Sequence, residues 1–190
     1  AALTGCAKTP GGAASGSTPL VLNEVAHSIF YAPQYAAIEL GYFEEEGIDL
    51  TLVNGAGADK VMTALISGDA QIGFMEGSQD YAVNFAQLTQ RAGNFLVGRQ
   101  PEDNFKWENL KGKKVLGGRA GGMPQMVFEY ILKKHGLDPK TDLTIDQSIN
   151  FGLTAAAFTS NDADYTVEFE PFATTLESEG SGTVVASLGT

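Results

Sequence analysis

Short apolar runs alternate with amphipathic helical patterns along almost the whole chain, and this alternation limits the fold more than any other feature. Glycine, at 23 of the 190 residues, and proline separate the segments. Apolar runs of four to eight residues between turn residues are typical of β-strands, whereas apolar residues three and four apart are typical of helices. Strands that alternate with helices are joined by right-handed crossovers and form mainly parallel sheets. The sequence therefore predicts an α/β fold with flanking helices.

The individual segments follow from this pattern. Strands are predicted at residues 20–25, 48–53, 71–75, 81–88, 94–98, 113–116, 143–146, 164–169 and 184–187. The runs at 81–88 and 94–98 are close enough to form a hairpin. Helices are predicted at 33–40, around 61–66, at 124–135, at 153–158 and after Pro171. The buried face of the helix that begins near Pro124 is expected to carry Val127, Tyr130, Ile131 and Leu132.

The N-terminal residues Leu3, Thr4, Gly5 and Cys6 resemble a bacterial lipobox. In such a motif the peptide is cut before the cysteine, whose thiol carries a diacylglyceryl group. We therefore expect residues 1–5 to be a signal-peptide remnant and Cys6 to be lipidated. This predicts an extracytoplasmic protein that only its lipid anchors to the outer face of the cytoplasmic membrane. The alternative is a chance tetrapeptide before a surface cysteine.

Composition divides the rest of the chain. The Gly/Ser-rich residues 6–18 are expected to form a flexible tether behind the lipidated cysteine. Residues 19–99 are predicted to form a first lobe and residues 113–190 a second one. The charged, turn-rich residues 100–112 are expected to connect the two lobes.

The charge balance narrows the range of partners. A net charge of −11 argues against nucleic acid or an anionic membrane surface as the binding partner. A metal site is also not expected, because the chain has only two histidines, His27 and His135, and no acidic cluster to accompany them. Neither observation identifies a ligand.

Four segments in their order and spacing resemble a known family, the NMT1/THI5-like substrate-binding proteins of ABC importers, which includes nitrate, sulfonate, taurine and thiamine-pyrimidine binding proteins. The segments are APQYAAIELGYFEEEGIDLTL at 32–52, GADKVMTALISGDAQIGFM at 57–75, LKGKKV at 110–115 and EFEP at 168–171. The resemblance implies a two-lobed fold like that of type II periplasmic binding proteins, C-terminally incomplete, with a small-molecule ligand between the lobes. It also implies hinge closure, delivery to an ABC permease, a monomer, no cofactor and no catalytic activity.

The chain departs from the family pattern after Met75 and Glu76. Family members usually continue there through a further loop and the start of a helix, which normally form one wall of the site. We therefore expect either a more open pocket or a deletion at this point.

Candidate ligand-binding residues follow the predicted strands, because ligands of parallel sheets bind beyond the carboxyl ends of the strands. The candidates are His27, Ser28, Tyr31, Gly55, Gly57, Arg119, Gly121, Gly122, Tyr165, Glu168 and Glu170. Backbone N–H groups of the two glycine loops suit an anion or a carbonyl, and Arg119 suits a carboxylate, sulfonate or phosphate. Structural roles compete with these: Ser28 can cap a helix, the glycines can form tight turns, and the arginine can be a solvated charge.

The acidic candidates favour one class of ligand. Glu168 and Glu170 lie two residues apart on a strand and are expected on the same face, where they would accept hydrogen bonds from amino groups. Tyr31, Tyr165 or Phe169 would supply an aromatic wall. This set favours a thiamine-type aminopyrimidine over a sulfonate, taurine or nitrate. The alternative role for Glu170 is to cap the helix that follows it.

Two other classes of protein share this pattern. Some relatives are pyrimidine-synthesising enzymes that use pyridoxal phosphate, for which Lys60, Lys113 or Lys114 would have to form a Schiff base. The effector domain of a transcription regulator has the same two-lobed architecture but needs a helix-turn-helix, whose place the lipobox takes here.

Overall fold

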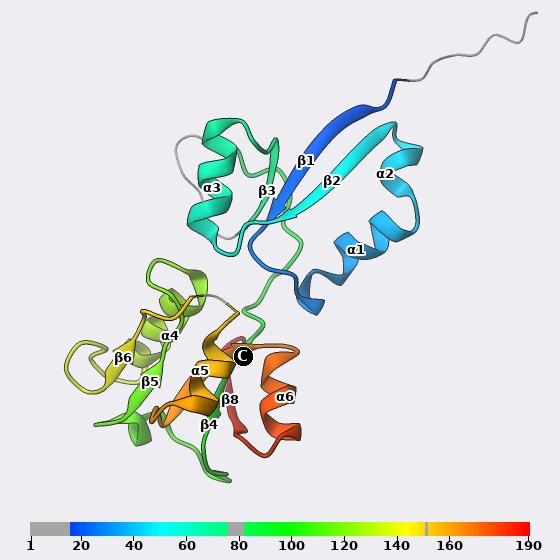
Figure 1. The fold of residues 1–190 in the computed structure, drawn as a ribbon. Coiled ribbons are helices and arrows are strands. Elements are labelled where there is room, and N and C mark those ends of the chain that lie inside the picture. Colours follow the sequence, from blue (N-terminus) through cyan, green and yellow to red (C-terminus); the bar gives the residue numbers. More distant parts are fainter. Residues whose placement is uncertain (1–15, 76–81, 151) are drawn as a thin grey trace, which may run out of the picture.

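The computed structural model describes residues 16–75, 82–150 and 152–190, and over these residues the chain forms two lobes, each with its own β-sheet (Figure 1). The predicted lipidation site Cys6, most of the tether and the departure after Met75 lie outside the described residues. Within the described residues, none of the helices combines the length and the apolar composition that crossing a bilayer requires.

The first lobe has a parallel sheet of three strands in the order β2-β1-β3. Its elements are β1 (Thr18–Glu24), the 3-10 helix η1 (Ile29–Tyr31), α1 (Ala32–Glu39), α2 (Tyr42–Glu45), β2 (Ile48–Asn54), α3 (Ala58–Ser67) and β3 (Ile72–Phe74). Helix α3 ends at Gly68, whose left-handed φ of 85° is a conformation that glycine adopts without steric cost. Burial increases along β1 toward Glu24, so the carboxyl end of the sheet is the covered end.

The second lobe has a sheet of five strands in the order β6-β5-β7-β4-β8. Its elements are β4 (Asn94–Gly98), the 3-10 helix η2 (Trp107–Leu110), β5 (Lys114–Leu116), α4 (Met123–Lys134), β6 (Thr144–Asp146), α5 (Thr154–Ser160), β7 (Tyr165–Phe169), α6 (Phe172–Ser178) and β8 (Thr183–Ser187). Strand β4 runs antiparallel to both of its neighbours, whereas β5 runs parallel to β6 and β7.

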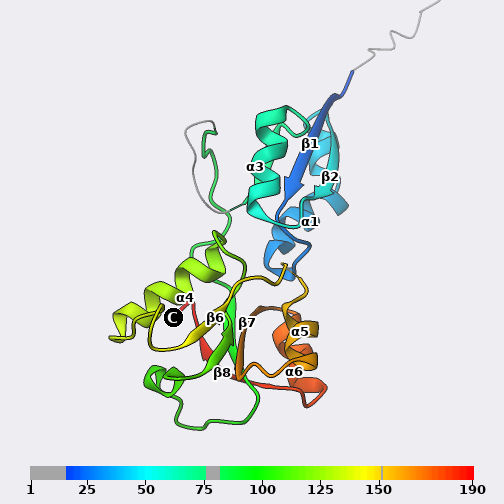
Figure 2. The ribbon, with the colours of Figure 1, turned by 60° about the vertical axis from the view of Figure 1, so that its left-hand side comes forward.

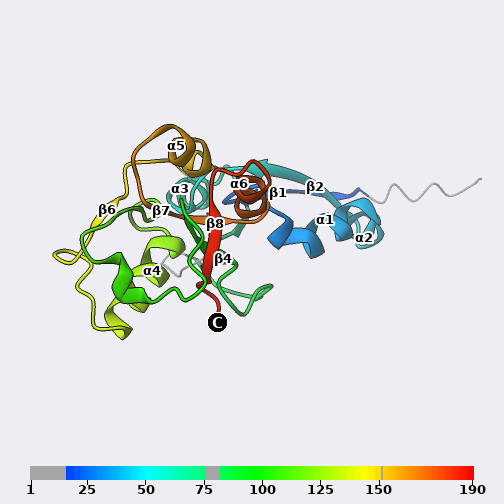
Figure 3. The same cartoon turned by 90° about the horizontal axis from the view of Figure 1, so that it is seen from below.

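Helices cover both faces of the second sheet (Figures 2 and 3). On one face, Phe128 and Leu132 of α4 pack with Leu96 and Val167 of the sheet. On the other face, α5 and α6 pack against β4 and β5, with Phe158 fully buried. Neighbouring residues of β4 and β5 therefore enter different cores, as expected for strands buried on both sides.

Sheet pairing corrects the predicted boundary between the lobes. Strand β4 was expected in the first lobe, in a hairpin with residues 81–88, but it pairs with β7 and β8 in the second sheet. Residues 82–88 form no strand. Residues 100–112 do not connect the lobes either, because Phe105 and Leu110 pack into the second-lobe core. The change of lobe occurs between β3 and β4. Alternation of apolar and polar residues predicts a strand but not the strand with which it pairs. Here β4 pairs with β7, about 70 residues later in the chain.

Most of the other predicted elements form within a few residues of the expected positions, but the buried face of α4 differs. The buried residues are Pro124, Phe128 and Leu132, which lie four residues apart on one side of the helix. Tyr130 was expected on this face, yet it is 66% exposed. The helix therefore packs against the sheet with the face that contains Phe128, and Tyr130 lies on the opposite face.

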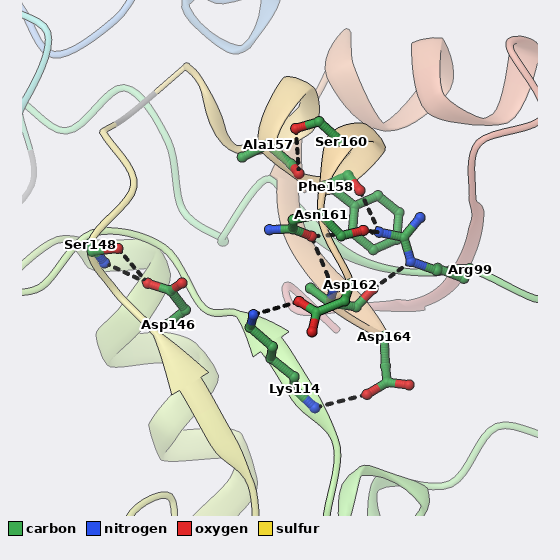
Figure 4. A network of polar contacts seen from close by, with 11 residues as sticks. Arg99, Lys114, Asp146, Ser148, Ala157, Phe158, Ser160, Asn161, Asp162 and Asp164 are labelled. Atoms are coloured by element: carbon green, nitrogen blue, oxygen red, sulfur yellow. Dashed lines mark hydrogen bonds and ion pairs between the residues drawn. The ribbon is translucent and has the colours of Figure 1, made fainter.

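Arg99, directly after β4, holds the end of α5 in place (Figure 4). Its guanidinium donates to the carbonyl oxygens of Phe158 at 2.5 Å, Asn161 at 2.5 Å and Ala163 at 2.6 Å, and it lies 4.3 Å from the centre of the Phe158 ring. The Phe158 carbonyl belongs to the last turn of α5, where the helix offers no intrahelical donor, and the Asn161 and Ala163 carbonyls belong to the segment that leads to β7. One side chain thus satisfies several acceptors and ties β4 to the next layer.

We predict that Arg99→Met lowers the free energy of unfolding by roughly 2–4 kcal/mol, because charge-assisted hydrogen bonds are lost and the acceptors stay half-buried. Urea unfolding followed by far-UV circular dichroism measures the change. Lys111→Met removes an exposed positive charge of the same lobe and is the matched control. Equal stability of the two variants would contradict the role of Arg99.

Candidate functional site

Two adjoining hollows lie at the carboxyl end of the second sheet, where it faces the first lobe. Both are lined by Arg119, Pro124 and Phe169. The first, which we call the inner hollow, is partly open to solvent and is completed by second-lobe residues, including Thr154, Glu168 and Phe172. The second, the interlobe hollow, is also partly open to solvent and is completed by Val25, Tyr31, Gly57 and Ala58 of the first lobe together with Gly122 and Met123. Together they form a crevice between the lobes.

Glu168 is the carboxylate of the inner hollow and is only 2% exposed. The hydroxyl groups of Thr166 and Thr154 donate to its two oxygens at 2.7 and 3.0 Å. Burial raises the pKa of Glu168 to about 7, against the opposing effect of these two hydrogen bonds. The side chain therefore changes its charge near neutral pH, within a pocket that otherwise has a mainly apolar lining.

Arg119 is the cation of both hollows, and it is paired. Its Nη1 lies 2.5 Å from Oδ1 of Asp59, which stands in the first turn of α3 in the other lobe. The loop that carries Arg119 is held by two short-range hydrogen bonds, from Gly122 N to the Arg119 carbonyl at 3.1 Å and from Gly121 N to Gln125 Oε1 at 2.8 Å. The ion pair thus bridges the crevice from one lobe to the other.

The segment after β1 is fixed by a buried carboxylate. Glu24, which is 1% exposed, accepts hydrogen bonds from Gln34 Nε2 at 2.9 Å and Tyr35 Oη at 2.8 Å, and His27 Nδ1 lies 3.0 Å from its other oxygen. The Tyr35 hydroxyl in turn accepts from the backbone N–H of Ser28 at 3.0 Å. This network shapes the turn that carries the lobe contacts described next.

Two further contacts join the lobes beside the crevice. The Ser28 hydroxyl donates to the carbonyl oxygen of Glu170 at 3.2 Å, and the centres of the Phe30 and Phe169 rings lie 6.3 Å apart. Tyr31 is buried and packs with its ring 4.3 Å from that of Phe74. The aromatic groups at the crevice therefore come from both lobes.

The structure brings five of the predicted residues together at the hollows: Tyr31, Gly57, Arg119, Gly122 and Glu168. The other candidates make structural contacts. His27 contacts Glu24, Ser28 caps η1 and contacts Glu170, and the Gly121 N–H binds Gln125.

Three predicted residues differ most from their expected roles. A Cβ atom on Gly55 would lie 2.5 Å from Asn23 Oδ1, so this glycine allows close packing. Tyr165 was expected as an aromatic wall, but it is buried in the second-lobe core and its hydroxyl donates to the Glu102 carboxylate. Glu170 Oε2 accepts from Thr174 N at 3.1 Å and so caps α6, its predicted alternative role. Tyr165 and Glu168 are three residues apart on a strand, so they face opposite sides of the sheet.

Sequence reasoning missed Asp59, Thr154, Pro124 and Phe172. Asp59 lies two residues after Gly57, in the first turn of a helix, where acidic residues are common, so no local signal distinguishes it. Thr154 reaches Glu168 from a helix 14 residues earlier in the chain, a relation that only the fold creates. Phe172 was detectable in principle, because it follows the EFEP segment at the end of β7.

Comparison with known proteins defines the class. The family model described as NMT1/THI5 like matches residues 29–188. The chain therefore belongs to the NMT1/THI5-like family, as its motifs predicted. The protein named "Putative binding protein YtlA" from Bacillus subtilis (strain 168) is 46% identical over 182 residues, which are 90% of this chain and 54% of that protein. The chain thus spans about half the length of this relative.

Solved structures confirm the two-lobed fold of periplasmic binding proteins. The alkanesulfonate-binding protein SsuA from Xanthomonas axonopodis pv. citri, bound to MOPS, matches with a TM-score of 0.64 and 15% identity, covering 89% of this chain and 60% of that one. An ABC uptake transporter substrate binding protein from Streptococcus pneumoniae with bound histidine matches with a TM-score of 0.63 and 15% identity, covering 93% and 77%. At these identities the likeness concerns the fold.

We predict that Glu168 makes stability depend on pH. Its folded pKa of about 7 lies above the ordinary value of 4.5. The stabilising contribution of the protonated form is therefore complete below pH 4.5 and is lost as the pH rises to about 7, a change on the order of 3 kcal/mol. Glu168→Gln cannot ionise, so its stability relative to the parent protein should increase between pH 5 and pH 8.

Urea unfolding at pH 5, 6, 7 and 8 measures this difference. Glu179→Gln, at the exposed end of α6, removes the same charge from the surface and should show no such trend. A constant difference between Glu168→Gln and the parent protein across this range would show that the carboxylate is ionised throughout.

Proposed function

We propose that this protein is the solute-binding component of an ABC-type importer, which captures a small organic solute between its lobes and delivers it to a membrane permease. The observation that carries the proposal is the interlobe hollow, which residues of both lobes line. A ligand there contacts both lobes and so stabilises their closed arrangement. The names of the relative and of the neighbours, all binding proteins, support this class.

We propose a planar aromatic ligand that carries an amino group, such as a thiamine-type aminopyrimidine. The inner hollow offers the rings of Phe169 and Phe172, the apolar side chain of Val167 and one buried carboxylate, Glu168. An aromatic ring fits the apolar wall, and an exocyclic amino group donates to a carboxylate oxygen. This arrangement supports the aminopyrimidine that the sequence favoured.

A sulfonate, taurine or nitrate is the second candidate, because Arg119 lines both hollows and a guanidinium binds such oxyanions in a bidentate manner. In this structure, however, Asp59 occupies the guanidinium. The pyridoxal-phosphate alternative finds less support. Lys113 pairs with Asp164 and Lys114 with Asp162, and neither these lysines nor Lys60 belong to the described lining of the hollows.

We predict that an aminopyrimidine binds the protein and that Glu168→Gln weakens this binding at least tenfold, because glutamine replaces one acceptor oxygen with an N–H donor that opposes the ligand's amino group. Affinity for the parent protein should increase several-fold from pH 6 to pH 8, as Glu168 with its pKa of about 7 ionises and becomes the better acceptor. Isothermal titration calorimetry at both pH values measures the two effects.

Glu179→Gln is the matched control and should bind like the parent protein. Titrations with ethanesulfonate, taurine and nitrate run in parallel. Binding of an oxyanion alone would contradict the proposed ligand, and a stably folded protein that binds none of these compounds would count against the function itself.

The location of the protein is proposed from its N-terminal motif. We propose an extracytoplasmic monomer that the lipid on Cys6 attaches to the membrane. The prediction is that cells expressing the gene with its native leader incorporate an alkyne-labelled fatty acid into the protein, and that Cys6→Ser abolishes both the label and recovery in the membrane fraction. Labelling that persists in the Cys6→Ser variant would refute lipidation at this residue.

A further inference from the structure

We propose that Asp59 is a specificity-determining residue: by neutralising Arg119 across the crevice, it makes the closed site select against anionic ligands. This inference rests on the proposed solute-binding function and concerns the charge class of the solute. The inference is based on the ion pair between Arg119 Nη1 and Asp59 Oδ1, which lie 2.5 Å apart. The guanidinium of this pair lines both hollows.

The pair is built closely into the crevice. Its arginine side chain is only 20% exposed, whereas the aspartate is 59% exposed at the rim. Gly57 is the N-cap residue of α3 and has a φ of 146°, and a Cβ atom at this position would lie 2.8 Å from Asp59 Oδ1 and 2.9 Å from Arg119 Nη1. A larger residue at position 57 would push the two charges apart. The backbone of the first lobe therefore approaches the pair as closely as glycine allows.

Two contributions to the binding free energy disfavour an anionic ligand in such a site. It must displace Asp59 to reach the guanidinium, and it must approach the Glu168 carboxylate of the inner hollow. A neutral amino-bearing ligand leaves the pair intact and meets only the acceptor. Since a guanidinium in a partly buried site is a strong ligand for sulfonate or carboxylate, the residue that occupies it decides whether such anions bind.

The pair can be removed without removing every contact between the lobes. The Ser28 hydroxyl still donates to the Glu170 carbonyl, and the Phe30 and Phe169 rings still face one another, because Asp59 takes part in neither contact. A change of ligand class in an Asp59 variant would therefore reflect the freed guanidinium more than a general loss of closure.

The test compares Asp59→Asn, Arg119→Gln and the double variant Asp59→Asn/Arg119→Gln in the full chain, with ethanesulfonate as the anion and an aminopyrimidine as the amino-bearing probe. Asp49→Asn, on the exposed part of β2, changes the net charge equally and is the control. Calorimetry should give at least a tenfold gain in ethanesulfonate affinity for Asp59→Asn, no gain for Asp49→Asn, and loss of the gain in the double variant. Asp59→Ser is the second variant in case Asp59→Asn folds poorly.

The Nε–Hε resonance of Arg119 gives a readout that is independent of the aminopyrimidine. Ethanesulfonate should shift this resonance in Asp59→Asn but not in the parent protein. If this holds while no aminopyrimidine binds the parent protein, the proposed ligand fails and the role of Asp59 stands. If the aminopyrimidine binds but Asp59→Asn gains no anion affinity, the role of Asp59 is overturned. Tight binding of ethanesulfonate to the parent protein would also overturn it.

Discussion

The pairing of β4 between β7 and β8 is the interaction on which the rest of the structure depends. This strand enters the second sheet antiparallel to both neighbours, and Leu96 and Val97 are fully covered on opposite faces. Its partner β7 carries Glu168 and Phe169 near its carboxyl end, and Phe169 lines the interlobe hollow together with first-lobe residues. Arg99, at the far end of β4, anchors α5, which supplies Thr154 to Glu168. The crevice therefore depends on a strand that contributes no residue to its described lining.

The two charged groups of the crevice are controlled in different ways. Glu168 has no cation within its described hydrogen-bond set, and burial raises its pKa to about 7 against the opposing effect of two threonine hydroxyls. Arg119 forms an ion pair with an aspartate from the other lobe. A buried carboxylate that titrates and a cation that is already paired leave a site with little net positive charge, which suits a neutral, hydrogen-bonding solute better than an oxyanion.

The lobes differ in how they are held together. The second has two extensive apolar cores, whereas the described core of the first centres on Val25, Ala26 and Val61. The first lobe also depends on polar contacts: a buried carboxylate, Glu24, orders the turn after β1, and contacts across the crevice fix its orientation. Burial of apolar area stabilises the second lobe, and specific hydrogen bonds and one ion pair position the first against it.

The sequence by itself determined the α/β class, the family and the approximate position of most elements, because strand and helix periods and glycine punctuation are local properties. It also identified Gly57, Arg119 and Glu168 as crevice residues, since ligands of such α/β sheets bind beyond the carboxyl ends of the strands. Only the tertiary structure decided that β4 belongs to the second lobe, that Tyr165 is a core residue and that Asp59 faces Arg119. These relations join residues about 60 or more positions apart or depend on which face of a strand is covered, and local patterns carry no information about either.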